Sequence, residues 1–245
     1  MGSAGASSLI PAVKTEGLTK AFGNRLTLRG IDLEIKSGES VVIFGPNGAG
    51  KTTLLKVLAT IMNPSSGAVF IGGLNAKTSA EEVRRRIGIV THHTFLYGNL
   101  TAYENLDFYG RLYDVPDRHG RICELVEMVG MTSRLHHRVS TFSRGMQQRI
   151  SIARSLLHSP SIMLLDEAET GLDRQATAML WAAMRMEGGE KRTILLTTHN
   201  LERGLEVSER VIILDKGKIV SDGPKQGLDL PALENIYQSS TGTDL

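Results

Sequence analysis

Residues 45–53 have the sequence G-P-N-G-A-G-K-T-T and carry the clearest chemistry in this chain. An apolar β-branched run, 40–44, precedes them, and a run typical of a helix, 54–58, follows. In this context G-x-x-x-x-G-K-[ST] binds phosphate, because glycine lets successive backbone N–H groups point into one concavity and the helix start adds its positive dipole end. Lys51 supplies a charge for the β- and γ-phosphates, and the Thr52 hydroxyl can ligate Mg²⁺. The pattern predicts a nucleoside triphosphate site formed by Gly45, Pro46, Asn47, Gly48, Ala49, Gly50, Lys51, Thr52 and Thr53.

Two acids and a histidine follow apolar strands further along the chain. Asp166 and Glu167 come directly after the run 162–165, and His199 ends the run 193–199. Parallel sheets place ligands at the carboxyl ends of their strands, so Asp166 can hold Mg²⁺ and Glu167 can orient and polarise an attacking water. An acid pair there can instead cap the next helix, and a single histidine is usually structural. The nearby phosphate-binding pattern favours the catalytic interpretation, in which His199 lies beside the γ-phosphate.

A further candidate is the start of a helix. Ser143 and Gly145 open the helical pattern of 143–158 and can offer a hydroxyl and N–H groups to an anion. Taken alone, this pattern is equally typical of an ordinary N-cap.

Alternating strands and helices must bring these residues together. Strand patterns, several of them continuous and apolar as in buried parallel strands, occupy a segment from Val13, then 28–35, 40–44, 68–71, 87–90, 162–165, 193–199, and a hairpin of 211–214 with 218–220. Helical patterns follow the phosphate loop as far as Asn63 and Pro64, and occupy 79–86, 101–109, 121–131, 143–158, 174–186 and a short tail from Leu230 that frays after Ser239. Thr101 and Glu104 have the spacing of a capping box.

The long helical stretch lies between two stretches of alternating strand and helix, which is typical of an inserted subdomain. We expect a disordered leader over 1–10 and one ATPase domain over 11–222, with a helical subdomain inserted at about 93–157. A C-terminal extension over 223–245 completes the expected organisation.

Composition excludes several classes of protein. The 245 residues carry a formal net charge of +2, which is too small to indicate nucleic-acid binding. The single cysteine, Cys123, permits no disulfide framework and suits a reducing compartment. No apolar stretch approaches the length of a membrane span and no signal peptide is evident, so we expect any membrane role to depend on a partner.

Together these segments resemble the ATP-binding-cassette (ABC) ATPases over nearly the whole chain, from Val13 to Asp222. In chain order they are similar to that family's phosphate loop at 45–53, its signature at 143–147, its Walker B strand and catalytic glutamate at 162–167, its D-loop at Thr170, Gly171, Leu172 and Asp173, and its switch histidine at His199. The resemblance implies an α/β fold, a P-loop NTPase of ABC ATPase type, with a discontinuous α-helical subdomain and an N-terminal antiparallel β part.

The resemblance also assigns roles to individual residues. It implies that Phe22 stacks on adenine, although an aromatic on an early strand can equally belong to the core. Catalysis is implied for Glu167 and His199, ATP contact for Ser143, Gly145 and Asp173 in addition to the phosphate loop, and metal contact for Thr52, Asp166 and His92.

The chain departs from the family's pattern at a few positions. Arg144 and Met146 stand where the signature usually has Gly and Gln, and Ala168 stands where Pro usually follows the catalytic glutamate. His92, with His93 beside it, stands where the family has its Q-loop glutamine. An imidazole there predicts softer ligation of the metal or its water, and sensitivity to pH.

The partners implied by the resemblance are a second ATPase subunit and a membrane subunit. Two copies, or this chain and a similar partner, would face head to tail and trap two ATP molecules, each between one phosphate loop and the opposite signature. Residues 94–97 would receive a helix of a transmembrane permease, which places the chain at the cytoplasmic face of the cell membrane. ATP binding would close the pair and hydrolysis would reopen it, biasing the permease between two states.

For the cargo, the stretch 91–109 resembles the ATPase of the bacterial haem exporter of cytochrome c maturation, which also has His at the Q-loop position and then L-T-A-x-E-N-L-x-F-Y. Haem is therefore the expected cargo, and an exporter of drugs, polysaccharides or lipids with a separate permease is the alternative. A soluble ABC ATPase of DNA repair or translation is disfavoured, because the chain has neither a long coiled-coil insertion nor a second cassette. Intact Lys51, Asp166, Glu167 and His199 argue against a scaffold without turnover.

Overall fold

The computed structural model describes residues 10–169, 172, 174–187 and 190–242. Nearly all of the leader predicted for 1–10 lies outside the described residues, as do Thr170, Gly171 and Asp173 of the predicted D-loop. No helix in the described part of the chain is long and apolar enough to cross a bilayer.

A six-stranded sheet forms the centre of the molecule, with the strand order β12-β11-β3-β10-β7-β6. All neighbouring pairs are parallel except the edge pair of β11 and β12, which is the predicted hairpin. The strands are β3 (Ser40–Phe44), β6 (Ile87–Val90), β7 (Ile162–Asp166), β10 (Thr193–Thr197), β11 (Arg210–Asp215) and β12 (Lys218–Pro224). The sheet brings together segments far apart in the sequence, because β10 lies between β3 and β7.

The continuous apolar runs of the sequence become strands that are buried on both faces. Every residue of β3, β7 and β10 is buried. Successive side chains of a strand point to opposite faces, so Val41 and Ile43 enter one hydrophobic core whereas Val42 and Phe44 enter the other. The sheet therefore separates two cores, as is usual for parallel sheets covered on both sides.

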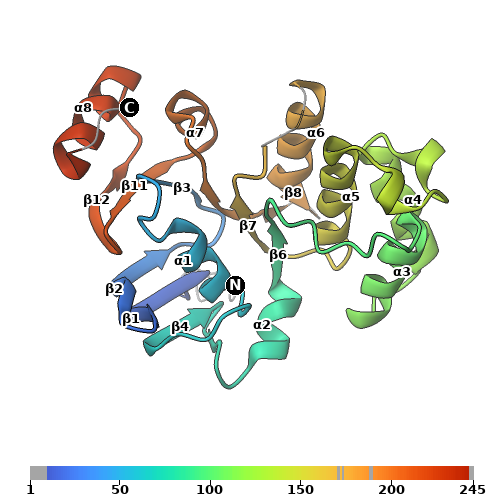
Figure 1. The fold of residues 1–245 in the computed structure, drawn as a ribbon, viewed down its shortest axis with the longest axis horizontal. Helices are drawn as coiled ribbons and strands as arrows, with labels where there is room; N and C mark the ends of the chain where they lie inside the picture. The colour runs from blue at the N-terminus through green and yellow to red at the C-terminus, as the bar shows by residue number, and fades with distance from the viewer. Residues whose placement is uncertain (1–9, 170–171, 173, 188–189, 243–245) are drawn as a thin grey trace, which may run out of the picture.

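A second, antiparallel sheet packs on one side, with the order β2-β1-β4-β5. Its strands are β1 (Val13–Phe22), β2 (Arg25–Ile35), β4 (Ser66–Ile71) and β5 (Leu74–Asn75). Buried residues of β1, β2 and β4 share one core with α1 (Lys51–Leu58) and with α2 (Ala80–Arg86) (Figure 1). The expected N-terminal antiparallel part is thus present. Strand β1 ends at Phe22, the residue expected to stack on adenine.

Three helices group on the other side of the molecule (Figure 1). They are α3 (Ala102–Leu112), α4 (Arg118–Met128) and α5 (Arg144–Leu156), joined by the 3₁₀ turns Thr132–Arg134 and Val139–Thr141. The predicted capping box starts α3: Glu104 N–H donates to the Thr101 hydroxyl, and Thr101 N–H donates to the Glu104 carboxylate. The helix predicted for 121–131 begins earlier, because Asp117 caps its first turn, and ends before Gly130, which has a φ of 66°.

The remaining elements are α6 (Arg174–Arg185), the short pair β8 (Met186–Glu187) and β9 (Glu190–Lys191), α7 (Leu201–Val207) and α8 (Leu230–Thr241). The sequence patterns did not predict α7, which is only seven residues long and begins at an Asn200 cap. The tail helix α8 continues past Ser239 and packs against α7 and the β11–β12 hairpin.

Candidate functional site

The glycine-rich segment forms a turn between β3 and α1 that only glycine can make at two positions. Gly45 has a φ of 151°, and a Cβ there would lie 2.0 Å from the carbonyl oxygen of Leu214. Gly50 has a φ of 110°, and its Cβ would lie 2.9 Å from Leu28. The turn is therefore held tightly against its surroundings, and it delivers the chain into α1 at Lys51.

Lys51 is buried at the start of α1, and its side chain folds back onto the glycine-rich turn. Its ammonium group donates to the carbonyl oxygens of Gly45, at 2.5 Å, and Pro46, at 3.2 Å. Burial lowers the pKa of the Lys51 ammonium, and the charges of Glu167 and Asp166 oppose this shift. A cation that is removed from water attracts an anion more strongly than a surface lysine would.

A cavity of about 410 Å³ opens above this turn. Its lining comes from the β1–β2 hairpin, the turn itself, the first residues of α1 and the end of β7: Phe22, Arg25, Thr27, Pro46, Asn47, Gly48, Ala49, Gly50, Lys51, Thr52, Thr53 and Glu167. Phe22 is 47% exposed, so its ring is available at the wall of the cavity and is not part of the core. An aromatic wall at one side and a cationic, N–H-rich floor at the other match the two ends of a nucleotide.

Asp166 lies beneath the cavity, buried at the end of β7. One of its carboxylate oxygens, Oδ1, accepts hydrogen bonds from the hydroxyls of Thr52, at 3.0 Å, and Thr197, at 2.8 Å. These contacts link α1, β7 and β10. A hydroxyl oxygen and a carboxylate side by side are the hard oxygen donors that Mg²⁺ prefers, so this pair fits such an ion. No group of three or more His, Cys, Asp and Glu residues in the described ranges is arranged to hold a metal ion.

Glu167, which lines the cavity, contacts His199, which does not. His199 Nε2 lies 2.6 Å from Glu167 Oε1, a hydrogen-bond distance. Strand order explains the contact, because β10, which leads to His199, runs between β3 and β7. The Glu167 backbone has a φ of 51°, and its N–H donates to the Thr197 carbonyl at 3.1 Å. This left-handed turn carries the carboxylate from the end of β7 towards the phosphate loop.

The other predicted site residues lie elsewhere in the chain. Ser143 and Gly145 start α5, where the Ser143 hydroxyl accepts from Met146 N–H at 3.3 Å, and neither lines the cavity. His92 is exposed, does not line the cavity, and has its ring 4.1 Å from that of His93. Asp173 lies outside the described residues. One chain thus assembles the phosphate loop, Asp166, Glu167 and His199, but not the signature residues.

Sequence reasoning missed three residues around the site. Arg25 and Thr27 line the cavity, and Thr197 fixes the Asp166 carboxylate. Arg25 follows Phe22 across the tight turn of the β1–β2 hairpin, so the hairpin pattern was the available signal. For Thr197, the signal was its place at the end of the apolar run before His199.

Comparison with known proteins agrees with this geometry. The sequence pattern of the ABC transporter family matches residues 28–170. The chain is 37% identical over 222 residues to the ABC transporter ATP-binding protein NatA of Bacillus subtilis strain 168, covering 89% of this chain and 87% of that protein. It is 35% identical over 214 residues to the daunorubicin resistance ATP-binding protein DrrA3 of Streptomyces coeruleorubidus, covering 86% of this chain and 68% of that protein. These relatives do not support haem as the cargo.

A solved structure extends the comparison to a nucleotide-bound state. The ATP-binding cassette MJ0796, solved as a dimer in a post-hydrolysis state with ADP and Pi, superposes with a TM-score of 0.79 at 29% identity. The match covers 88% of this chain and 100% of that one.

Proposed function

This chain belongs to the ABC transporter family of ATP-binding proteins, and we propose that it is the ATP-hydrolysing subunit of an exporter whose membrane-spanning part is a separate chain. The family couples ATP hydrolysis to transport. The observation that carries the proposal is the contact of His199 with Glu167, a residue that lines the cavity floored by the phosphate loop.

In the proposed reaction, the phosphate loop holds the triphosphate and Phe22 stacks on the base. Lys51 turns its ammonium from the loop carbonyls towards the β- and γ-phosphates, because phosphate oxygens carry more charge than a carbonyl oxygen. Thr52 and Asp166 would hold Mg²⁺, which supplies electrostatic stabilisation of the transferring phosphoryl group. His92, although exposed in this chain, is proposed to contact the metal or its water in the closed complex.

Glu167 is proposed to orient the attacking water and accept its proton. The His199 imidazole, at hydrogen-bond distance from the Glu167 carboxylate, fixes the direction of that carboxylate. Since positioning dominates catalysis of phosphoryl transfer, loss of either side chain removes turnover while the phosphate loop still binds ATP.

The second part of the active site is proposed to come from a partner copy. Ser143 is exposed at the start of α5, and its hydroxyl and the N–H groups of the first turn suit the γ-phosphate of a nucleotide on another subunit. Asp173 would contact ATP across the same interface. The dimeric state of the related cassette MJ0796 supports this arrangement.

This dimer has a direct test in size-exclusion chromatography of Glu167→Gln with ATP and Mg²⁺. We expect a dimer, because bound ATP is not hydrolysed. Adding Ser143→Arg should return the protein to a monomer, whereas adding Ser239→Arg on the exposed face of α8 should leave the dimer intact. A dimer that survives Ser143→Arg would contradict the composite site.

A permease subunit is proposed to dock beside α3, where exposed apolar side chains gather. Phe95, Tyr97, Phe108 and Leu112 are between 39% and 60% exposed, and the rings of Tyr97 and Phe108 pack edge to face at 5.5 Å. An adjoining cavity of about 240 Å³ is lined in part by Phe95, Tyr109 and Arg154. A patch of this kind beside a hollow suits an amphipathic helix of a partner. The segment 94–97, expected to receive such a helix, contributes two of these aromatic residues.

Sedimentation with membranes from the source cell tests the docking surface. We expect the chain to sediment with membranes that contain its permease, and Phe108→Ser to remain in the supernatant. Leu26→Ser, an exposed leucine on the β1–β2 hairpin, should still sediment. Equal sedimentation of all three proteins would refute docking at α3. Success would support the proposed location at the cytoplasmic face of the membrane.

For the cargo, we favour an amphipathic drug or lipid over haem, because relatives include a daunorubicin resistance protein. Cells without the chain distinguish the two. Drug export predicts increased sensitivity to daunorubicin with normal c-type cytochromes. Loss of covalently bound haem from c-type cytochromes, with unchanged drug sensitivity, would instead support the haem exporter that the stretch 91–109 predicts.

A further inference from the structure

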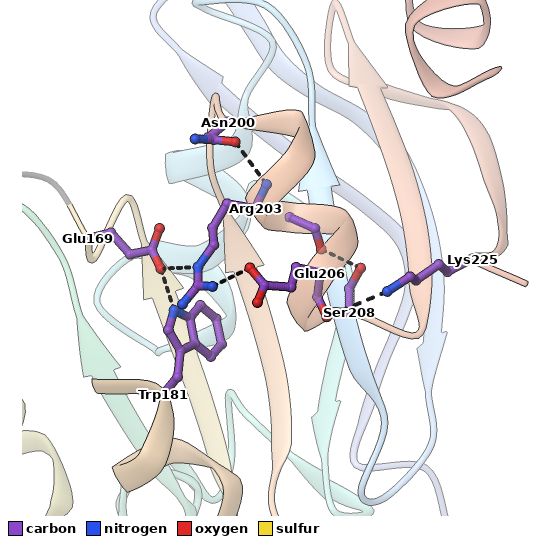
Figure 2. Close-up of polar contacts among 8 residues, drawn as sticks. Glu169, Trp181, Asn200, Arg203, Glu206, Ser208 and Lys225 are labelled. Atoms are coloured by element: carbon purple, nitrogen blue, oxygen red, sulfur yellow. Dashed lines mark hydrogen bonds and ion pairs between the residues drawn. The ribbon is translucent and has the colours of Figure 1, made fainter. Parts of the chain in front are cut away.

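A network of three side chains lies behind the catalytic pair and has no role in the mechanism so far. Oε1 of Glu169 accepts hydrogen bonds from the Trp181 indole N–H and from Nε of Arg203, the latter at 3.0 Å (Figure 2). The Arg203 guanidinium also lies 5.5 Å from the centre of the Trp181 ring, and it pairs with Glu206 on its other side. The network joins the segment after β7 to α6 and α7.

Burial and charge make this network stronger than a surface ion pair. Trp181 is 4% exposed, and the side chains of Arg203 and Glu169 are 23% and 25% exposed. Burial alone would lower the pKa of Arg203, but its hydrogen bonds to Glu169 and Glu206 outweigh burial and raise the pKa. The guanidinium therefore stays charged and makes charge-assisted hydrogen bonds, which are about twice as strong as neutral ones.

The network holds both sides of the catalytic contact. Glu169 follows Glu167 by two residues, and Arg203 follows His199 by four. Arg203 is in the first turn of α7, and its backbone N–H donates at 2.8 Å to the side chain of Asn200, the residue directly after His199. The backbone of Arg203 is thus bound to the residue after His199, and its side chain is bound to the segment that carries Glu167.

The path of the segment after β7 decides where the Glu167 carboxylate points. Glu167 has a φ of 51°, a backbone conformation that costs free energy in a residue other than glycine. The Glu167 N–H donates to the Thr197 carbonyl at 3.1 Å and the Ala168 carbonyl accepts from the Gln148 side chain at 3.1 Å. The bridge to Arg203 adds a contact further along the same segment. A cavity of about 280 Å³, lined in part by Glu167, Trp181 and His199, leaves room for the segment to move.

We propose that Arg203 is a positioning residue for hydrolysis: its bridge to Glu169 above Trp181 holds the Glu167 carboxylate and the His199 imidazole 2.6 Å apart. This inference rests on the catalytic roles proposed for Glu167 and His199. Arg203 does not line the cavity above the phosphate loop, so the bridge affects the orientation of the reacting groups and not the binding of ATP.

Steady-state hydrolysis of Mg-ATP by Arg203→Gln and Glu169→Gln tests the bridge. Each variant should lower kcat about tenfold with KM for ATP within twofold, since misplacement of a reacting group can cost up to about a hundredfold. Because both substitutions act on the same charge-assisted contact, the double variant should be no slower than the slower single variant. Arg203→Lys keeps the positive charge but lacks the planar set of guanidinium N–H donors, so it should recover part of kcat.

Glu206→Gln is the matched control, because it removes the other partner of the same guanidinium on the exposed side of α7. It should leave kcat unchanged. Fluorescence provides a second readout, since Trp181 is the only tryptophan in the chain. Its emission should shift in Arg203→Gln and Glu169→Gln but not in Glu206→Gln.

Two results would overturn the inference. One is wild-type kcat in folded Glu169→Gln, an isosteric variant that keeps an acceptor for the Trp181 indole. The other is an equal loss of kcat in Glu206→Gln. Glu167→Gln separates failure of this inference from failure of the proposed function. If Glu167→Gln hydrolyses ATP as fast as wild type, the catalytic assignment of Glu167 is wrong. If Glu167→Gln is inactive while the Arg203 variants are fully active, only the role of Arg203 is refuted.

Discussion

A half-buried histidine between the helical part and the sheet should make the protein sensitive to mild acid. His158 follows α5, stacks on Tyr113 with ring centres 3.9 Å apart, and has Nε2 3.0 Å from the carbonyl oxygen of Ile87. Burial, with a smaller contribution from the charges of Arg154, Arg85 and Arg121, lowers the pKa of His158 from 6.5 to about 4, and the hydrogen bond to Ile87 opposes this shift.

The direction of the effect follows from where the proton binds. Between pH 6.5 and about 4, His158 takes up a proton in the unfolded chain but not in the folded one. Its contribution to the free energy of unfolding is therefore complete above pH 6.5 and falls as the pH drops through this window. Each pH unit costs about 1.4 kcal/mol, so at about pH 5, roughly 1.5 units below the unfolded pKa, the loss is about 2 kcal/mol.

Urea unfolding followed by circular dichroism at about pH 7.5 and about pH 5 measures this loss. Other groups also titrate, so the test compares variants. His158→Gln keeps an N–H donor for Ile87 but cannot titrate, and it should lose about 2 kcal/mol less than wild type between the two pH values. His137→Gln, at an exposed histidine, should behave like wild type. An equal pH dependence in wild type and His158→Gln would refute the reasoning.

Two further substitutions test the nucleotide site. Phe22→Ala should raise KM for ATP about tenfold, because base–aromatic stacking contributes about 1–3 kcal/mol, whereas Leu26→Ala on the same hairpin should not; equal KM values in steady-state assays would remove Phe22 from the site. Gly45→Ala should lower Tm by roughly 5–15 °C, because its Cβ would lie 2.0 Å from the Leu214 carbonyl oxygen, and thermal unfolding checks this. Gly223→Ala, where a Cβ meets nothing within 4 Å, should leave Tm near wild type, and a similar loss in both would contradict the steric account.

Much of the fold followed from the sequence because its signals are local. The apolar runs at 162–165 and 193–199 predict buried parallel strands, and the structure confirms β7 and β10 with every residue buried. The capping box at Thr101 was also local and is confirmed. Helix boundaries were less accurate, since α4 begins with Asp117, a cap in the left-handed conformation that periodicity does not reveal.

The candidate site was predictable in its residue types but not in its assembly. The positions of Lys51, Asp166 and Glu167 follow from strand ends, whereas the contact of His199 with Glu167 depends on β10 lying between β3 and β7. Strand order is set by tertiary packing, so no local pattern gives it. The bridge from Glu169 to Arg203 spans 34 positions for the same reason and has no sequence signature.

Glu167, aligned by His199, is proposed to activate the water that attacks ATP. The most direct measurement is phosphate release from Mg-ATP by wild type and Glu167→Gln, with nucleotide binding measured in parallel. We predict turnover in wild type, and in the variant unchanged ATP affinity with kcat reduced at least about a hundredfold, in the range of removing a general base. Turnover by Glu167→Gln at the wild-type rate would contradict the account.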